Sequence, residues 1–149
     1  MHANRPVYLS PALRGEEYSP SMHSITLEVR DYELDAQGVV NNGVYFGYFE
    51  HARHRLLADR GVDFVALHRQ GIDPVVVEAK IAYVRPLRST ERFRVLTDVT
   101  KHGALRYVFT QRIELADDAA ECARAEITAV ALKDGRPAKV PQLDALLSG

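Results

Sequence analysis

The sequence predicts an α+β domain in which a largely antiparallel sheet wraps around one long central helix. One segment repeats apolar residues at the three- and four-residue spacing of a helix, whereas five segments alternate apolar and polar residues as half-buried strands do. The predicted order is one strand, the helix and then four strands joined by short turns, which favours antiparallel pairing. Periodicity does not fix the order of strands within the sheet, and an arrangement with the first strand paired centrally is one option.

The first predicted strand covers residues 24–30, where three apolar residues alternate with polar ones: Ile25, Leu27 and Val29. A loop is predicted to follow at residues 31–43. It contains Gly38 and the pair Asn41-Asn42, residue types that tolerate unusual backbone angles or cap helices. The chain therefore changes direction before the helix begins.

The helix is predicted at about residues 42–60. Its apolar residues recur on one side: Tyr45, Tyr48, Phe49, Ala52 and Leu56. Asn42 would cap the start of the helix, and Gly61 would stop it. A two-residue hairpin at Asn42-Gly43 is the alternative, but it would require alternation where the sequence has helical spacing.

A short helical turn is predicted at residues 63–70, and four strands follow at 75–83, 93–99, 105–115 and 121–132. One face of the first of these strands is predicted to carry Val75, Val77, Ala79, Ile81 and Tyr83. The last strand has alanines and Ile127 on one side, and small side chains there would let the helix approach the sheet closely. Gly47 within the helix is predicted to have the same use.

Composition favours one domain of a globular protein. The chain has 149 residues, 46% of them hydrophobic, and a net charge of -1, which gives no general attraction for nucleic acid or an anionic membrane. Residues 1–23 are predicted to form a mobile arm and residues 24–149 the domain. The single cysteine, Cys122, cannot form an internal disulfide, and no apolar run is long enough for a membrane span or a signal peptide. These features favour a cytoplasmic location.

The most specific pattern lies where the loop enters the helix. Residues 35–45 read DAQGVVNNGVY, residues 48–53 read YFEHAR, and a proline-bearing strand end at residues 83–86 reads YVRP. Over about residues 24–135 the chain resembles the 4-hydroxybenzoyl-CoA thioesterase family of acyl-CoA thioesterases. That resemblance implies a hotdog fold and hydrolysis of an acyl thioester of coenzyme A or acyl carrier protein. It also implies a homodimer or homotetramer, and no cofactor.

Asn41 and Asn42 depart from the family pattern, because many members carry an aromatic residue and a histidine at these positions. The asparagine pair is more similar to a branch that acts on aliphatic acyl thioesters, including plant acyl-lipid thioesterases. The resemblance leaves the identity of the acyl chain and of its carrier open.

The resemblance implies that Asp35 is the catalytic carboxylate, as a general base for water or as a nucleophile that forms a mixed anhydride. It also implies that the backbone N–H of Asn42 binds the oxyanion, with Gly43 as its neighbour, because a helix N-terminus presents unpaired N–H groups. Each residue has an ordinary structural interpretation as well. Asp35 is able to form an Asx turn, and Asn42 is able to cap the helix.

Four further residues are predicted to bind substrate: Asn41, Tyr45, Glu50 and Arg88. Glu50 lies on the predicted helix, where a related branch of hotdog enzymes places a catalytic glutamate, but an ion pair with Arg53 is its structural alternative. Arg88 follows the bend at Pro86 and is a candidate for the phosphates of coenzyme A. Other basic residues near strand ends are weaker candidates: Arg85, Arg92, Arg94 and Lys101.

Other chemistries have little support in the sequence. His51 and His54 lie three residues apart, but no third ligand at metal-site spacing accompanies them, and no nucleotide-binding glycine motif is present. Cys122 lies in a predicted strand without an evident base and is interpreted as a small core thiol. Two alternatives to hydrolysis remain, a hotdog dehydratase or hydratase and an acyl-CoA-binding protein without catalysis.

Overall fold

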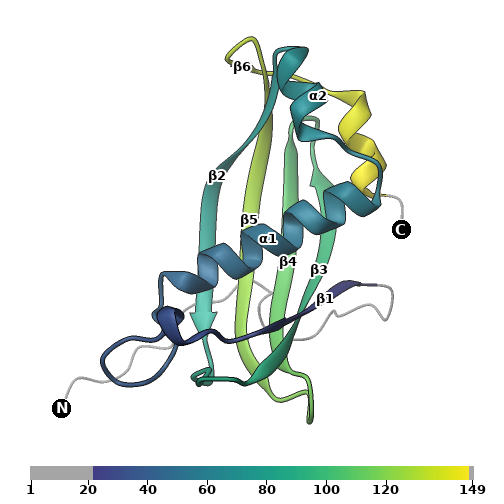
Figure 1. Ribbon diagram of the computed structural model, residues 1–149. Helices are drawn as coiled ribbons and strands as arrows, with labels where there is room; N and C mark the ends of the chain where they lie inside the picture. Colours follow the sequence, from purple (N-terminus) through teal and green to yellow (C-terminus); the bar gives the residue numbers. More distant parts are fainter. Residues whose placement is uncertain (1–21, 148–149) are drawn as a thin grey trace, which may run out of the picture.

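The computed structural model describes residues 22–147 and has the predicted α+β architecture (Figure 1). The strands are β1 (His23–Glu28), β2 (Ile72–Tyr83), β3 (Arg92–His102), β4 (Arg106–Leu115), β5 (Glu121–Lys133) and β6 (Arg136–Pro137). The helices are α1 (Val44–Asp59) and α2 (Phe64–Arg69), with 3-10 segments η2 (Asp31–Glu33) and η3 (Pro141–Leu147). Residues 1–21 of the predicted arm lie outside the described residues.

The sheet has the strand order β1-β3-β4-β5-β2, and every neighbouring pair is antiparallel. The first strand therefore forms an edge of the sheet and is not paired centrally. β2 forms the other edge, and the short β6 pairs with the end of β5. Among residues 22–147, neither helix has both the length and the apolar character needed to cross a membrane.

Helix α1 lies across one face of the sheet (Figure 1) and buries the predicted apolar side. Its buried residues are Tyr45, Tyr48, Phe49, Ala52, Leu56 and Leu57. The inner face of β5 carries the predicted small residues, all buried in the same core as the helix residues: Ala123, Ala125, Ile127, Ala129 and Ala131. The backbone of α1 approaches β3 and β1 most closely, so the predicted close approach of the helix at the small residues of β5 is not supported.

The start of α1 differs from the prediction. Gly43, in helical conformation, is the residue before the helix, and Asn42 makes no side-chain cap. The side chain of Asn41 instead accepts a hydrogen bond of 2.9 Å from the N–H of Gly43. Asn41, and not Asn42, therefore stabilises the start of the helix with its side chain.

The end of α1 agrees with the prediction. Gly61 has a φ of +77°, and its N–H donates to the carbonyl of Ala58. The N–H of Val62 donates to the carbonyl of Leu57, which completes a Schellman motif. Glycine adopts this left-handed conformation without a Cβ penalty, so Gly61 stops the helix.

The prediction that Val75 and Val77 share one face of β2 with Ala79, Ile81 and Tyr83 is wrong. β2 contains a bulge at Val77, because Val76 pairs with Ala129 and Glu78 pairs with Thr128 on β5. One extra residue moves every earlier side chain to the opposite face, so Val76 and not Val75 shares the inner face with Ala129. Period alone does not reveal a bulge, since all of residues 75–77 are valine.

Gly47 does not provide a close helix approach. A Cβ added at this position would meet no atom within 4 Å, and the residue is exposed on the side of α1 away from the buried residues. The predicted packing role of this glycine is therefore wrong.

Candidate active site

The loop that carries Asp35 is a tight hairpin closed by backbone pairing. Leu34 forms an antiparallel bridge with Val40, and the N–H of Asp35 donates to the carbonyl of Val39 over 2.8 Å. Gly38 occupies the turn with a φ of +77°, and its N–H donates to the carbonyl of Asp35. This geometry holds Asp35 rigidly beside the start of α1.

The Asp35 carboxylate forms the Asx turn that its structural interpretation predicted. Its Oδ1 accepts hydrogen bonds from the N–H groups of Gln37 at 2.8 Å and Val39 at 3.4 Å. Among the residues that the structure describes, no donor contacts Oδ2. One oxygen thus orients the side chain, and the other remains open in a half-buried position.

The N–H groups at the start of α1 are not equivalent. The N–H of Gly43 donates to the Asn41 side chain over 2.9 Å, so Gly43 is the neighbour of the predicted donor and its own N–H is already used. Within residues 22–147 the N–H of Asn42 has no acceptor. The N–H of Val44 donates to the carbonyl of Asn41 over 2.9 Å, which fixes the peptide that carries the Asn42 N–H. The Asn42 donor is therefore both open and oriented.

Asp35 and Asn42 line one cleft of about 280 Å³. Tyr45 lines the same cleft from the first turn of α1. The end of β2 and the segment after it form the other wall: Tyr83, Val84, Arg85 and Pro86. The cleft thus lies between the Asp35 loop, the helix start and the strand end that carries the YVRP pattern.

Tyr83 and Arg85 are cleft residues that the sequence assignment missed or ranked low. The hydroxyl of Tyr83 donates to the carbonyl of Asn42 over 2.8 Å, and its ring contacts that of Tyr45 edge-on at 5.0 Å between centroids. Burial raises the pKa of both tyrosines. Arg85 is exposed and pairs with Glu91 at 3.3 Å. The signal for these residues was present, because YVRP was part of the family pattern.

Four of the candidate cations do not line the cleft: Arg88, Arg92, Arg94 and Lys101. The backbone of Arg88 pairs with Val39, and its N–H donates to Glu91 over 2.8 Å, so this residue supports the Asp35 loop through its main chain. Arg94 binds Glu114 at 2.8 Å and Lys101 binds Asp144 at 2.8 Å. Arg85 is therefore the best placed of the candidate arginines.

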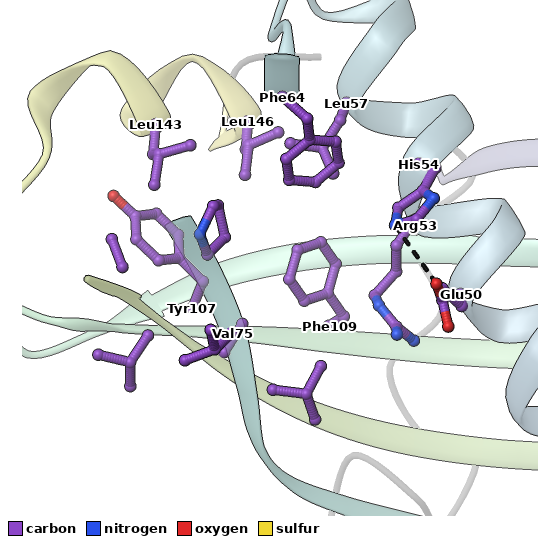
Figure 2. A pocket seen from close by; sticks show the side chains of 15 residues that line it. Glu50, Arg53, His54, Leu57, Phe64, Val75, Tyr107, Phe109, Leu143 and Leu146 are labelled. Carbon is purple, nitrogen blue, oxygen red and sulfur yellow. Dashed lines mark ion pairs between the residues drawn. The ribbon is translucent and has the colours of Figure 1, made fainter. Parts of the chain in front are cut away.

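Glu50 lies outside the Asp35 cleft. It follows Asn42 by eight residues, which corresponds to about 12 Å along a helix. Its side chain, 60% exposed, pairs with His54 at 3.8 Å and not with Arg53, so the predicted partner is wrong. Glu50 lines a second pocket of about 240 Å³ between α1, the start of β2 and η3 (Figure 2).

No group of three His, Cys, Asp or Glu side chains suited to a metal ion occurs in the described part of the chain. Cys122 is fully buried, and burial raises the pKa of its thiol, which disfavours the thiolate. The groups that line the cleft are thus the Asp35 carboxylate, the backbone at Asn42, two tyrosine side chains and the Arg85 guanidinium.

Known proteins resemble this chain in sequence and in fold. Residues 29–147 match the family model of the thioesterase-like superfamily. The acyl-acyl carrier protein thioesterase ATL2, chloroplastic, of Arabidopsis thaliana is 38% identical over 87% of this chain and 69% of its own length. The acyl-CoA thioester hydrolase YbgC of Escherichia coli is 30% identical over 58% of this chain and 64% of its own length.

Among solved structures, a 1,4-dihydroxy-2-naphthoyl-CoA thioesterase from Synechocystis superposes with a TM-score of 0.79 at 22% identity. The superposition covers 85% of this chain and 96% of that structure, and it confirms the predicted hotdog fold. The similarity to the plant enzyme confirms the predicted acyl thioesterase branch, and the predicted class of thioester hydrolase is confirmed with it. From the fold, the motif and these relatives, the chain belongs to the thioesterase-like superfamily.

Proposed function

We propose that this chain hydrolyses acyl thioesters of acyl carrier protein or coenzyme A, with Asp35 as the catalytic carboxylate and the N–H of Asn42 as the oxyanion donor. One observation carries the proposal: Asp35, with one open carboxylate oxygen, and Asn42, with an open N–H, line the same cleft. A thioester carbonyl in this cleft would meet a base or nucleophile at its carbon and a donor at its oxygen.

Two routes use these groups and consume one water each. In the first, Oδ2 of Asp35 takes a proton from water, whose oxygen attacks the carbonyl carbon. In the second, Oδ2 attacks the carbon itself and forms a mixed anhydride, which water then opens. In both routes the C–S bond breaks, the thiol leaves with a proton and the free acid remains.

The names of relatives support the choice of carriers. The Arabidopsis relative is named for acyl carrier protein thioesters, and the Escherichia coli relative is named for acyl-CoA thioesters. The plant relative is also named as chloroplastic, so the cytoplasmic location of this chain stays a prediction.

Binding without catalysis is the alternative that one observation favours. Asp35 already has a structural function in its Asx turn, and a protein that only bound acyl-CoA would need no more from this residue. The two functions differ in whether a thiol is released.

The test is a thiol-release assay on the full chain with acyl-CoA and acyl carrier protein thioesters of increasing chain length. Calorimetric binding of the same acyl-CoA panel is measured in parallel. We expect release well above the uncatalysed rate for at least one thioester. Saturable binding without release from any member of the panel would contradict hydrolysis and support the binding protein.

We also propose that the chain forms a homo-oligomer built from dimers. β2 is an edge strand without a partner on its outer side among the described residues, and it exposes Val76 by 50% and Val77 by 54%. An exposed apolar edge strand is a template for pairing with another strand. A second copy of β2 in antiparallel orientation would pair with the free backbone N–H and C=O groups of this edge. The resulting interface would be self-complementary.

A further inference from the structure

The second pocket is separate from the Asp35 cleft and is mostly apolar. Its walls come from the later turns of α1, from α2, from the start of β2, from β4 and β5, and from η3 (Figure 2). Apolar side chains from five of these elements surround the cavity: Leu57, Phe64, Phe109, Ala131, Leu143 and Leu146. Such a lining suits an acyl chain, as apolar ligand pockets in general do.

One cation is placed in this apolar pocket. Arg53 extends from α1 toward the sheet, and its guanidinium carbon lies 5.9 Å from the centre of the Phe109 ring (Figure 2). Burial lowers the pKa of Arg53. A charge held in such surroundings is costly unless hydrogen bonds or an opposite charge compensate for it.

The hydrogen-bond partner of Arg53 is neutral. Its Nη1 donates to Oε1 of Gln111 over 3.1 Å. Gln111 is fully buried, and its Nε2 donates to the carbonyl of Phe49 and to Oγ1 of Thr97, both at 3.0 Å. Because both donor positions of the amide are used, Oε1 must face Arg53, and Gln111 holds the guanidinium in place.

No carboxylate within residues 22–147 forms an ion pair with Arg53. Burial lowers the pKa of Arg53 more than the charge of Glu50 raises it, and the exposed Glu50 side chain makes its ion pair with His54 at 3.8 Å (Figure 2). A guanidinium has five N–H donors, and only one of them has an acceptor here. The pocket therefore offers a fixed positive charge with open donors within an apolar lining.

We propose that this pocket binds the acyl group of the thioester and that Arg53 selects acyl groups that carry an oxygen acceptor, either a hydroxyl or a carboxylate. This inference rests on the proposed hydrolysis of acyl thioesters. The apolar lining accommodates the hydrocarbon part, and the open guanidinium donors bind the oxygen. Gln111 is a positioning residue, because it acts through Arg53.

The position of the pocket relative to the cleft suits this division of roles. α1 contributes to both, since Asn42 and Gly43 precede it and Arg53 lies in its second half. Ten residues separate Gly43 from Arg53, which is about 15 Å along the helix axis. An extended acyl chain of medium length spans such a distance. β2 also borders both sites, with Val76 at the pocket and Tyr83 at the cleft.

The test compares thioesters of equal chain length that differ only in the oxygen. The panel contains unsubstituted saturated acyl-CoAs, the same chains with a hydroxyl at one of the last two carbons, and the same chains with a terminal carboxylate. The measured quantity is the ratio of kcat/KM between each oxygen-bearing thioester and its unsubstituted counterpart. We expect the wild-type ratio to exceed about ten for at least one position, the size that a charge-assisted hydrogen bond contributes.

Three variants assign this preference to the pocket cation. Arg53→Met replaces the guanidinium by an uncharged end and keeps the length of the unbranched stem. We expect it to lower the ratio of kcat/KM between oxygen-bearing and unsubstituted thioesters about tenfold. Arg53→Lys keeps a charge and should retain part of the preference. Arg55→Met is the matched control, because Arg55 lies on the same helix but is exposed and pairs with Asp59 at 3.9 Å. Melting temperatures establish that each variant is folded.

A ratio near one in the wild type, or a ratio that Arg53→Met leaves unchanged, would overturn the proposal and reduce Arg53 to a structural partner of Gln111. Calorimetric binding of the corresponding S-alkyl-CoA thioethers, which cannot be hydrolysed, gives a readout that does not require turnover. If no thioester is hydrolysed, the proposed function fails. An affinity difference between oxygen-bearing and unsubstituted thioethers that Arg53→Met abolishes would still support the selective pocket, and its absence would contradict it.

Discussion

Tyr83 connects the end of β2 to the residue that carries the proposed oxyanion donor. Its hydroxyl donates to the carbonyl of Asn42, and its ring packs edge-on against Tyr45. Asn42 is thus fixed on its carbonyl side by β2, while the preceding peptide is fixed by the N–H of Val44. This preorganisation matters because an oxyanion donor is effective only when it is already aimed at the developing charge.

Replacing Tyr83 by phenylalanine should therefore impair turnover more than stability. We expect kcat/KM for the best thioester to fall about threefold to tenfold, the equivalent of one hydrogen bond of about 1 kcal/mol. Tyr32→Phe is the matched control, since Tyr32 is 76% exposed and lies outside the cleft. Equal activity in the two variants would show that the Tyr83 hydroxyl does not orient the site.

At the scale of residues, the sequence predicted the local part of the site and not the distant part. Asp35, Asn42 and Tyr45 lie within eleven positions of one another, so one loop and one helix turn bring them together. Tyr83 and Arg85 reach the cleft through strand pairing across the whole sheet, which residue spacing does not encode. The Asx turn of Asp35 was also predictable, because it involves only neighbours in the chain.

At the scale of elements, Gly47 weakens α1 without any packing benefit that the structure reveals. Gly47→Ala should raise the free energy of unfolding by up to about 1 kcal/mol, because alanine has the higher helix propensity. The space around an added Cβ is open, so no steric cost opposes this gain. Denaturation by urea measures the change, and a loss of stability would contradict the absence of a packing role.

The C-terminal segment η3, which the sequence did not predict, is attached through a carboxylate. Lys101 and the hydroxyl of Tyr107 bind Oδ1 of Asp144 at 2.8 and 2.6 Å. These hydrogen bonds, that of Lys101 first, lower the pKa of Asp144 below its ordinary value. Because the pKa is lower in the folded state, the interaction stabilises the fold above the ordinary value of about 4 and is lost as the pH falls below it.

Asp144→Asn should therefore lower the melting temperature at pH 7, and the difference from the wild type should shrink as the pH falls below about 4. Asp117→Asn is the control, because Asp117 is an exposed carboxylate in the turn between β4 and β5. A difference that stays constant from pH 7 to below pH 4 would show that the charge of Asp144 does not stabilise the attachment of η3.

The elements themselves were largely predictable, and their exceptions have physical reasons. α1 and the five long strands appear where periodicity placed them, because each buries one face against a single core. The bulge at Val77 was hidden by a run of identical residues. Strand order was not predictable because it depends on pairing between distant segments, and η3 is too short to show a period.

At the scale of the whole molecule, the β2 edge should determine the oligomeric state. We expect light scattering at micromolar protein to give at least twice the chain mass of 16.7 kDa. Val77→Lys places a charge on the exposed edge and should shift the protein to the monomer. Val65→Lys is the matched control, since Val65 is 61% exposed and belongs to α2, not to the edge strand. A monomeric wild type in an active sample would contradict this prediction.

Asp35→Asn tests the central claim most directly. The amide oxygen of asparagine is able to accept the same hydrogen bonds from Gln37 and Val39, so the Asx turn should survive while the carboxylate charge is lost. Asp31→Asn is the matched control, because Asp31 lies outside the cleft, where its carboxylate accepts a hydrogen bond from Ser89.

The measurement is turnover of the best thioester by the two folded variants, with melting temperature and acyl-CoA affinity recorded alongside. We predict that Asp35→Asn remains folded, binds acyl-CoA as the wild type does and loses at least about a hundredfold in turnover, the lower range of general-base catalysis. Asp31→Asn should keep full activity. Near-normal turnover by folded Asp35→Asn would contradict the proposed mechanism and leave Asp35 with only its structural function in the loop.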